Sequence, residues 1–207
     1  MKKTLRAVIS VFLVFAIAIA GISPITDVYA ATKTVKVTGK YYQSDARKMK
    51  KMINAFRTGD EAWYYKEEGS DKKVKLKDLK KLSYDYELEK IAMRRAAEIS
   101  ILFEHVRPNG EMCFSLFPDG YYTCGENIAM GTSSIMSTSE VLELWKETKE
   151  SYNGQGHRRN MLNEEFTAVG VACFEANGNK YWVQEFGSPN SGKSKTKACN
   201  SEKTVKI

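Results

Sequence analysis

Histidine, proline and cysteine are scarce in this chain, and no apolar stretch is long enough for an ordinary membrane helix. The 207 residues include 2 His, 4 Pro and 4 Cys. The longest apolar run, residues 7–22, has 16 residues, whereas a helix that crosses a bilayer needs about 20. This excludes a multipass membrane protein. With 43% hydrophobic and 28% charged residues, the composition also excludes a disordered or fibrous chain and predicts one globular domain with flanking segments.

Several catalytic and metal-binding signatures are absent as well. The chain contains no H-E-x-x-H, no G-x-S-x-G and no C-x-x-C pattern, so nothing points to the common zinc proteases, the serine hydrolases or a paired-cysteine zinc site. We also find no internal repeat.

The positive charge is unevenly placed. The formal net charge is +7, but residues 31–81 carry +8, residues 82–187 carry −7 and residues 188–207 carry +4. A nucleic-acid-binding domain would gather its basic groups on a folded face with aromatic or helical readers. In this chain the basic groups lie mainly in the Lys-rich segment 31–81 and in the tail 188–207, so we expect no nucleic-acid partner. The acidic central region is instead suited to a cation.

The first 30 residues have the three parts of a secretory signal peptide. A basic start precedes the apolar run, and Val28-Tyr29-Ala30 forms a small-residue exit, which predicts cleavage after Ala30. The alternative is an uncleaved anchor. No cysteine near the cut offers a lipid attachment site and no sorting signal ends the chain, so the expected product is secreted and extracellular, without a stable membrane anchor.

Periodicity then divides the rest of the chain. Residues 31–44 read as an extended leader, 45–187 as the domain and 188–207 as a basic polar tail, either solvated or in contact with anionic wall polymers. Helical spacing predicts helices over 44–57, 85–105 and 137–150 and a short one from 156. Two β-rich runs, 167–174 and 180–186, flank Asn177-Gly178, a strong hairpin signal. This order predicts an α+β fold in three layers.

The four cysteines all lie in the exported part, where pairing is expected. Cys113 and Cys124 bracket a short loop and form the preferred local bridge, which leaves Cys173 to pair with Cys199. Free thiols or a zinc site are the alternatives.

Four ordered stretches carry a more specific resemblance: FEHVRPNG (103–110), CGENIA (124–129), GHRRNMLNEEFTAVGVA (156–172) and YWVQEFG (181–187). Through them the chain resembles a bacterial CAP domain, also called the SCP, pathogenesis-related-1-like or allergen V5 family, over roughly residues 45–187. The resemblance implies a three-layer α-β-α sandwich of the CAP/SCP type with a C-terminal antiparallel β-hairpin. It also implies a cleft that gathers two His and two Glu.

Carried onto this chain, the resemblance implies that His105, His157 and Glu126 surround a divalent cation, often zinc. Two imidazoles and a carboxylate are suitable zinc ligands that leave a position open, and such a site could activate water. The alternative for Glu126 is structural: it would receive backbone N–H groups at a helix start and hold the CGENIA turn.

The second glutamate of the family has no obvious counterpart. Its place, three residues after Trp145, is occupied by Thr148. At 100° per residue, a helix continuing to residue 150 turns Glu147 and Glu150 away from the face of Trp145. We therefore expect Thr148 to line the cleft and the extra loop 148–156 to reshape its entrance.

Other residues in the motifs have simpler roles. Arg107 is expected to pair with a carboxylate and Asn160 to hydrogen-bond backbone, while either Gln184 or Glu185 faces the cleft. The residues expected in the core are Trp145, Met161, Leu162, Val169, Val171, Trp182 and Phe186.

The fold alone does not identify the function, because proteins with the same fold can have unrelated activities. We expect a secreted, non-enzymatic binding module for a lipid or sterol, a cell-wall fragment or a protein. The alternative is a hydrolase in which a metal or a His–Glu pair activates water to cleave peptides or peptidoglycan, with His105, Glu126 and His157 as its catalytic groups. Loss of the second carboxylate removes the obvious acid–base partner. A purely structural interaction protein is the third possibility.

Overall fold

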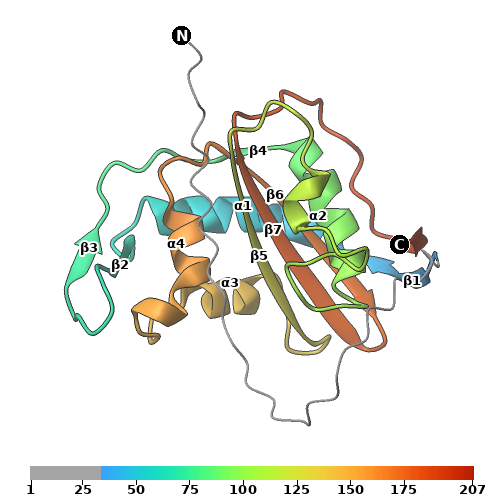
Figure 1. Cartoon of the computed structure of the whole chain (residues 1–207), viewed down its shortest axis with the longest axis horizontal. Coiled ribbons are helices and arrows are strands. Elements are labelled where there is room, and N and C mark those ends of the chain that lie inside the picture. The colour runs from blue at the N-terminus through green and yellow to red at the C-terminus, as the bar shows by residue number, and fades with distance from the viewer. Residues whose placement is uncertain (1–33) are drawn as a thin grey trace.

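The structure, a computed structural model, describes residues 34–207. The predicted signal peptide and its cleavage site lie outside this range. The described residues form a mixed sheet with helices on both faces, together with a small separate hairpin (Figure 1). No helix in residues 34–207 combines the length and apolarity that a membrane crossing requires.

The main sheet has six strands, five of them in the order β5-β7-β6-β1-β8, and β4 runs parallel to β6 at one end. Strands β2 and β3 form the separate antiparallel hairpin. The strands are β1 (Lys36–Tyr41), β2 (Trp63–Tyr65), β3 (Lys73–Lys75), β4 (Ser83–Tyr84), β5 (Thr123–Thr132), β6 (Ala168–Ala176), β7 (Asn179–Ser188) and β8 (Glu202–Lys206).

Two helical layers cover the two faces of this sheet. Helices α1, α3 and α4 bury one hydrophobic cluster against β6 and β7, and α2 buries another on the opposite face. This confirms the α+β class and the three-layer α-β-α sandwich. The helices are α1 (Gln43–Arg57), α2 (Tyr86–Glu98), α3 (Thr138–Lys146) and α4 (Gly156–Leu162), with short 3₁₀ segments η1 (Cys113–Leu116) and η2 (Tyr152–Gly154).

The predicted hairpin is present. β6 and β7 pair antiparallel, and Asn177 and Gly178 both have positive φ, 50° and 75°. Two positive φ values in a two-residue turn match the right-handed twist of the strands, which is why Asn-Gly is favoured there. All seven residues expected in the core are buried: Trp145, Met161, Leu162, Val169, Val171, Trp182 and Phe186.

Helices α2 and α3 are shorter than predicted, and of the eight strands in the described residues only β6 and β7 were predicted as strands. α2 ends at Glu98 rather than 105, since the Ser100 hydroxyl binds the Ala97 carbonyl and the Glu104 carbonyl accepts a hydrogen bond from Arg95. The chain therefore turns back over the helix end. The CGENIA segment, expected within a loop or at a helix start, is part of β5 and pairs with β7 along its whole length.

The leader and the tail are both paired in the same sheet. β1 lies within the predicted leader and pairs with β6, while β8 lies within the predicted tail and pairs with β1. The sheet therefore includes strands on both sides of the range 45–187. Between β7 and β8 the tail crosses α2, where Asp85 accepts hydrogen bonds from Ser191.

Candidate functional site

Both histidines are bound to glutamates. Nδ1 of His105 lies 2.7 Å from Oε1 of Glu126, and Nδ1 of His157 is hydrogen-bonded to Oε1 of Glu147. The side chains of His105 and His157 are 41% and 28% exposed, whereas those of Glu126 and Glu147 are 0% and 9% exposed. Each pair therefore consists of a buried carboxylate that orients an accessible imidazole.

The pairing of Glu147 with His157 corrects the expectation for this helix. α3 stops at Lys146, and Glu147 adopts the left-handed conformation with φ 47° and ψ 40°. This reverses the chain direction, so the carboxylate reaches His157 and also accepts a hydrogen bond from the Arg158 backbone N–H at 3.0 Å. Thr148, expected to line the cleft, is exposed to solvent, as is Glu150.

This correction predicts the effect of two neighbouring substitutions. Glu147→Gln should lower the free energy of unfolding by about 1–3 kcal/mol, because it removes a charged acceptor from two hydrogen bonds at a nearly buried position. Thr148→Ala, at the adjacent exposed position, should change it by less than about 0.5 kcal/mol. Urea unfolding of both variants measures the difference. Equal effects would place Glu147 outside the site.

Glu126 lies in a buried ionic cluster. Arg95, with 0% of its side chain exposed, donates from Nε to Oε2 of Glu126 at 2.7 Å and from Nη1 to Glu98 at 2.9 Å. Burial alone would raise the pKa of Glu126, but hydrogen bonds from His105 and Arg95 more than offset it, so the pKa is lowered. Glu126 is therefore an ionised anchor for His105.

Side chains along a strand point alternately to the two faces of the sheet, and this alternation decides which residues share a face with Glu126. Glu126 and its cross-strand neighbour Glu185 face the α2 layer, whereas Asn127 and its neighbour Gln184 face the other layer. Gln184 contacts the sulfur atoms of core methionines there. Of the two candidates on β7, Gln184 and Glu185, it is therefore Glu185 that lies beside the His105–Glu126 pair.

Arg107 and Asn160 behave as expected. Arg107 donates hydrogen bonds from Nε and Nη2 of its guanidinium to Glu98, with Nη2 at 3.0 Å from Oε1. Asn160 donates to the backbone carbonyl of Glu126 at 3.2 Å. Both residues hold the loops around the site in place.

The structure brings two of the three predicted metal ligands together with a cysteine. Among the described residues, the possible ligand atoms of His105, Cys113 and Glu126 lie within 4.8 Å of one another, and His157 is not a member of that group. His157 lies on α4. A common ion held by His105, Glu126 and His157 stays a prediction.

The predicted disulfides are not formed in the described chain, where all four cysteines are free thiols. Cys173 belongs to the hydrophobic cluster under α1, but Cys199 packs against the cluster on the opposite face of the sheet. The sheet thus separates the members of this pair. Cys113 instead lies beside His105 and Glu126.

The thiols differ in accessibility. Burial raises the pKa of Cys124 to about 11 and raises the pKa values of Cys113 and Cys173 further. Cys113 and Cys173 are buried, whereas Cys124 and Cys199 are partly exposed. Because the thiolate is the reactive form, a pKa of about 11 leaves about 0.1% of Cys124 ionised at pH 8.

Thiol labelling should therefore show one fast group per folded chain. In reduced protein at pH 8, Ellman's reagent should label Cys199 first and the other three cysteines at least tenfold more slowly. Cys199→Ser should remove the fast phase, whereas Cys124→Ser should keep it. A fast phase that survives Cys199→Ser would contradict the raised pKa values of the other three thiols.

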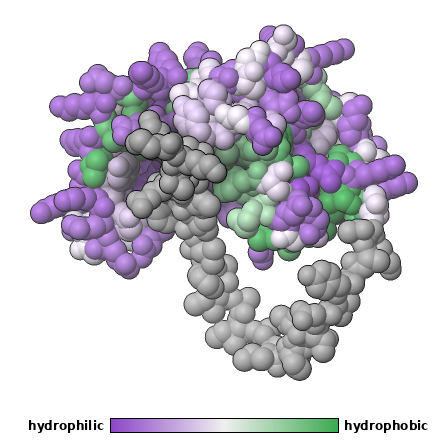
Figure 2. All heavy atoms as spheres, turned by 45° about the horizontal axis from the view of Figure 1, so that its top comes forward, coloured by the Kyte–Doolittle hydropathy of each residue, from purple (hydrophilic) through white to green (hydrophobic). Residues whose placement is uncertain are grey.

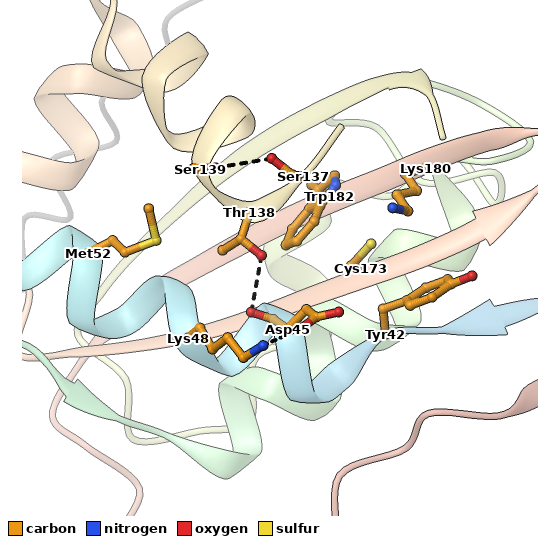
Figure 3. Close-up of a pocket in the computed structure, with 10 residues that line it drawn as sticks. All are labelled: Tyr42, Asp45, Lys48, Met52, Ser137, Thr138, Ser139, Cys173, Lys180 and Trp182. Atoms are coloured by element: carbon orange, nitrogen blue, oxygen red, sulfur yellow. Dashed lines mark hydrogen bonds and ion pairs between the residues drawn. The ribbon is translucent and has the colours of Figure 1, made fainter. Parts of the chain in front are cut away.

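A pocket of about 350 Å³ lies away from these pairs. It opens between the first turns of α1 and α3, with Asp45 and Lys48 on one side, Ser139 on the other and Trp182 at its base (Figure 3). It contains neither histidine, so the His–Glu pairs and this pocket are separate features.

Comparisons with known proteins agree with this architecture. The model of the cysteine-rich secretory protein family, CAP, matches residues 50–186. Protein YkwD of Bacillus subtilis (strain 168), described as uncharacterized, is 34% identical over 113 residues. That match covers 52% of this chain and 40% of YkwD, so the chain spans less than half of that relative.

Two solved structures share the fold. The crystal structure of NaASP2 with Zn²⁺ superposes with a TM-score of 0.51 at 22% identity, covering 78% of this chain and 85% of that one. An outer surface protein from Borrelia burgdorferi superposes with a TM-score of 0.50 at 15% identity, covering 72% of this chain and 97% of that one. With more than half of the residues matched by the family model, the chain belongs to the CAP, or cysteine-rich secretory protein, family.

Proposed function

We propose that this CAP-domain protein is a secreted, extracellular binding module without catalytic activity, and that its ligand is bound by the imidazoles of His105 and His157. One observation carries the proposal: both rings are held at Nδ1 by glutamates while remaining partly exposed. A carboxylate at Nδ1 holds the proton there in the neutral ring, so Nε2 becomes a hydrogen-bond acceptor. The complementary ligand offers hydroxyl or amide donors.

The surroundings support binding rather than catalysis. Ionised Glu126 is engaged by Arg95, and burial raises the pKa values of Cys113 and Cys124, so neither kind of group is poised as a nucleophile. The chain segment just before His105 carries exposed apolar side chains, Ile101, Leu102 and Phe103. Figure 2 likewise shows hydrophobic residues reaching an otherwise largely hydrophilic face. Polar acceptors beside apolar surface suit an amphipathic ligand.

Three probes distinguish the candidate classes of ligand. They are soluble cell-wall fragments, vesicles that contain sterol, and a panel of proteins unrelated to this chain. We expect one probe to bind without being cleaved. His105→Ala and His157→Ala should each weaken that binding by about tenfold, because each substitution removes one hydrogen bond and the contact between the ring and the ligand. Ser139→Ala, in the separate pocket of Figure 3, is the matched control.

The binding and cleavage results distinguish a binding module from a hydrolase. Binding that is indifferent to both histidine substitutions would refute the assigned site. Cleavage of a wall or peptide probe that disappears with either substitution would establish a hydrolase instead. Parallel measurements with added Zn²⁺ and in EDTA separate cleavage that needs a metal from cleavage that uses a His–Glu pair alone.

A further inference from the structure

The chain between the start of β3 and the start of β4 carries a dense run of positive charge. Residues 72–81 read KKVKLKDLKK, so the run contains lysines and a single acidic residue, Asp78. All of these lysine side chains are exposed. Among residues 34–207, the lysines that pair with carboxylates lie elsewhere, at positions 48, 90 and 146. We call the unpaired set the lysine ridge: Lys72, Lys73, Lys75, Lys77, Lys80 and Lys81.

The ridge is fixed to the body of the protein. Leu79 and Leu82 are buried in the hydrophobic cluster under α1. Asn54 of α1 accepts a hydrogen bond from the Leu82 N–H at 2.7 Å and donates one to its carbonyl at 2.9 Å, and Arg57 donates to the Lys80 carbonyl at 3.1 Å. Figure 1 shows this segment leading from the separate hairpin toward β4. The leucines therefore anchor the segment while the lysines between them stay at the surface.

Fixed lysines without carboxylate partners create a positive field. Side chains two residues apart in a strand lie on the same face about 6.6 Å apart, which places Lys73 and Lys75 within the Debye length of about 8 Å at physiological salt. Their ammonium groups therefore repel one another, and the row attracts anions. A ligand with several anionic groups in a row gains from each lysine it meets, whereas a single small anion gains from only one or two.

Two kinds of anionic partner fit this ridge poorly. A membrane-binding surface inserts apolar side chains into the lipid, but among the described residues the large exposed apolar side chains all lie outside the range 58–82. Single-stranded nucleic acid stacks its bases on free aromatic rings. The Trp63 ring beside the ridge is buried, and Lys73 Nζ and Arg158 Cζ lie 3.6 and 4.1 Å from its centroid, so it offers no free face.

We propose that the lysine ridge binds a flexible, linear polymer whose repeating unit carries a phosphate group. The ridge contains lysine and no arginine. Lysine contacts phosphate as a point charge, without the bidentate geometry of arginine, so the row suits a repetitive chain better than one fitted anion. Inorganic polyphosphate and poly(glycerol phosphate) share this chemistry. The ridge includes neither histidine, so this binding is independent of the ligand site proposed for His105 and His157.

Fluorescence anisotropy with each labelled polymer measures the binding. Raising the salt concentration from about 50 to 200 mM should weaken it about fiftyfold if about four lysines release counterions, at a slope of about 0.7 per contact. The triple substitution Lys77→Gln, Lys80→Gln and Lys81→Gln should weaken binding at least tenfold and lower the salt slope by about 2. The polymer that binds more tightly identifies the backbone that carries the phosphates.

The tail supplies a control with the same change in net charge. Lys193→Gln, Lys195→Gln and Lys197→Gln together replace three exposed lysines, and should leave the affinity within about twofold of the wild type because they lie outside the ridge. Both triple variants should keep the wild-type circular dichroism.

Three results would overturn the proposal. The first is that neither polymer binds at low salt. The second is that the ridge variant binds as tightly as the wild type, or that the tail variant loses as much affinity as the ridge variant. The third is that phosphatidylglycerol vesicles or single-stranded DNA bind through the same lysines more tightly than either polymer, which would assign the ridge to a membrane or to nucleic acid.

Discussion

Replacing Arg95 by alanine should lower the free energy of unfolding by about 3–5 kcal/mol, the usual cost of breaking a buried ion pair by removing one partner. Arg95 is fully buried and links Glu126, Glu98 and the Glu104 carbonyl. Without it, the Glu126 carboxylate stays in the interior, where it keeps the hydrogen bond to His105 but has no guanidinium partner. Glu98 keeps Arg107, so most of the loss falls on Glu126.

The adjacent residue supplies the control. Arg94 also pairs with Glu98, but its side chain is 33% exposed, and Arg94→Ala should cost about 1 kcal/mol or less. The double substitution Arg95→Ala with Glu126→Gln should recover part of the loss, since no unpaired charge then remains at that position. Urea unfolding of the wild type, Arg95→Ala, Glu126→Gln and the double variant measures the coupling. Full additivity would show that Arg95 does not stabilise the protein through Glu126.

The second large effect is expected at Gly170, where α2 crosses β6. A Cβ on Gly170 would lie 2.1 Å from the backbone nitrogen of Glu89 and 2.2 Å from the carbonyl carbon of Leu88. Backbone atoms cannot move aside as a side-chain tip can, so the helix must shift away from the sheet. Gly170→Ala should therefore destabilise the protein by about 3 kcal/mol, the upper end of the usual overpacking range.

Gly131, another strand glycine, is the matched control. The nearest atoms to its added Cβ would be Cγ and Sδ of Met136, each at 2.9 Å, rather than helix backbone, so Gly131→Ala should lower the melting temperature less than Gly170→Ala does. Because α2 carries Arg95, Gly170→Ala should also disturb the Glu126 cluster. Comparable melting temperatures for the two variants would contradict the close contact between α2 and β6.

The fold was largely predictable because its strongest signals are local. The helical spacing of Met49, Ile53 and Phe56 and the Asn177-Gly178 turn each specify their own element, and the capping box at Ser137 is present in the structure. The β5 strand was missed because its glycines and buried polar residues break the apolar alternation. Pairing with β7 supplies what the local pattern lacks.

The site was only partly predictable because it depends on contacts between distant segments. His105, Glu126 and His157 could be named from motifs, but the partner of His157 depends on the left-handed turn at Glu147, where no glycine or asparagine signals such a turn. Likewise, Cys113 and Glu185 join Glu126 only through the loop after α2 and the β5–β7 register. The angular positions of residues around a helix, at 100° per residue, cannot reveal either contact.

Two glutamates hold the two histidines at Nδ1. The most direct test is the tautomer of each neutral ring, measured by long-range ¹H–¹⁵N correlation in metal-free protein. The structure predicts the Nδ1–H tautomer for both His105 and His157, with Glu126→Gln and Glu147→Gln each perturbing the ring they contact and leaving the other unchanged. An Nε2–H tautomer in either ring of the wild-type protein would show that the glutamate does not hold that ring through Nδ1–H.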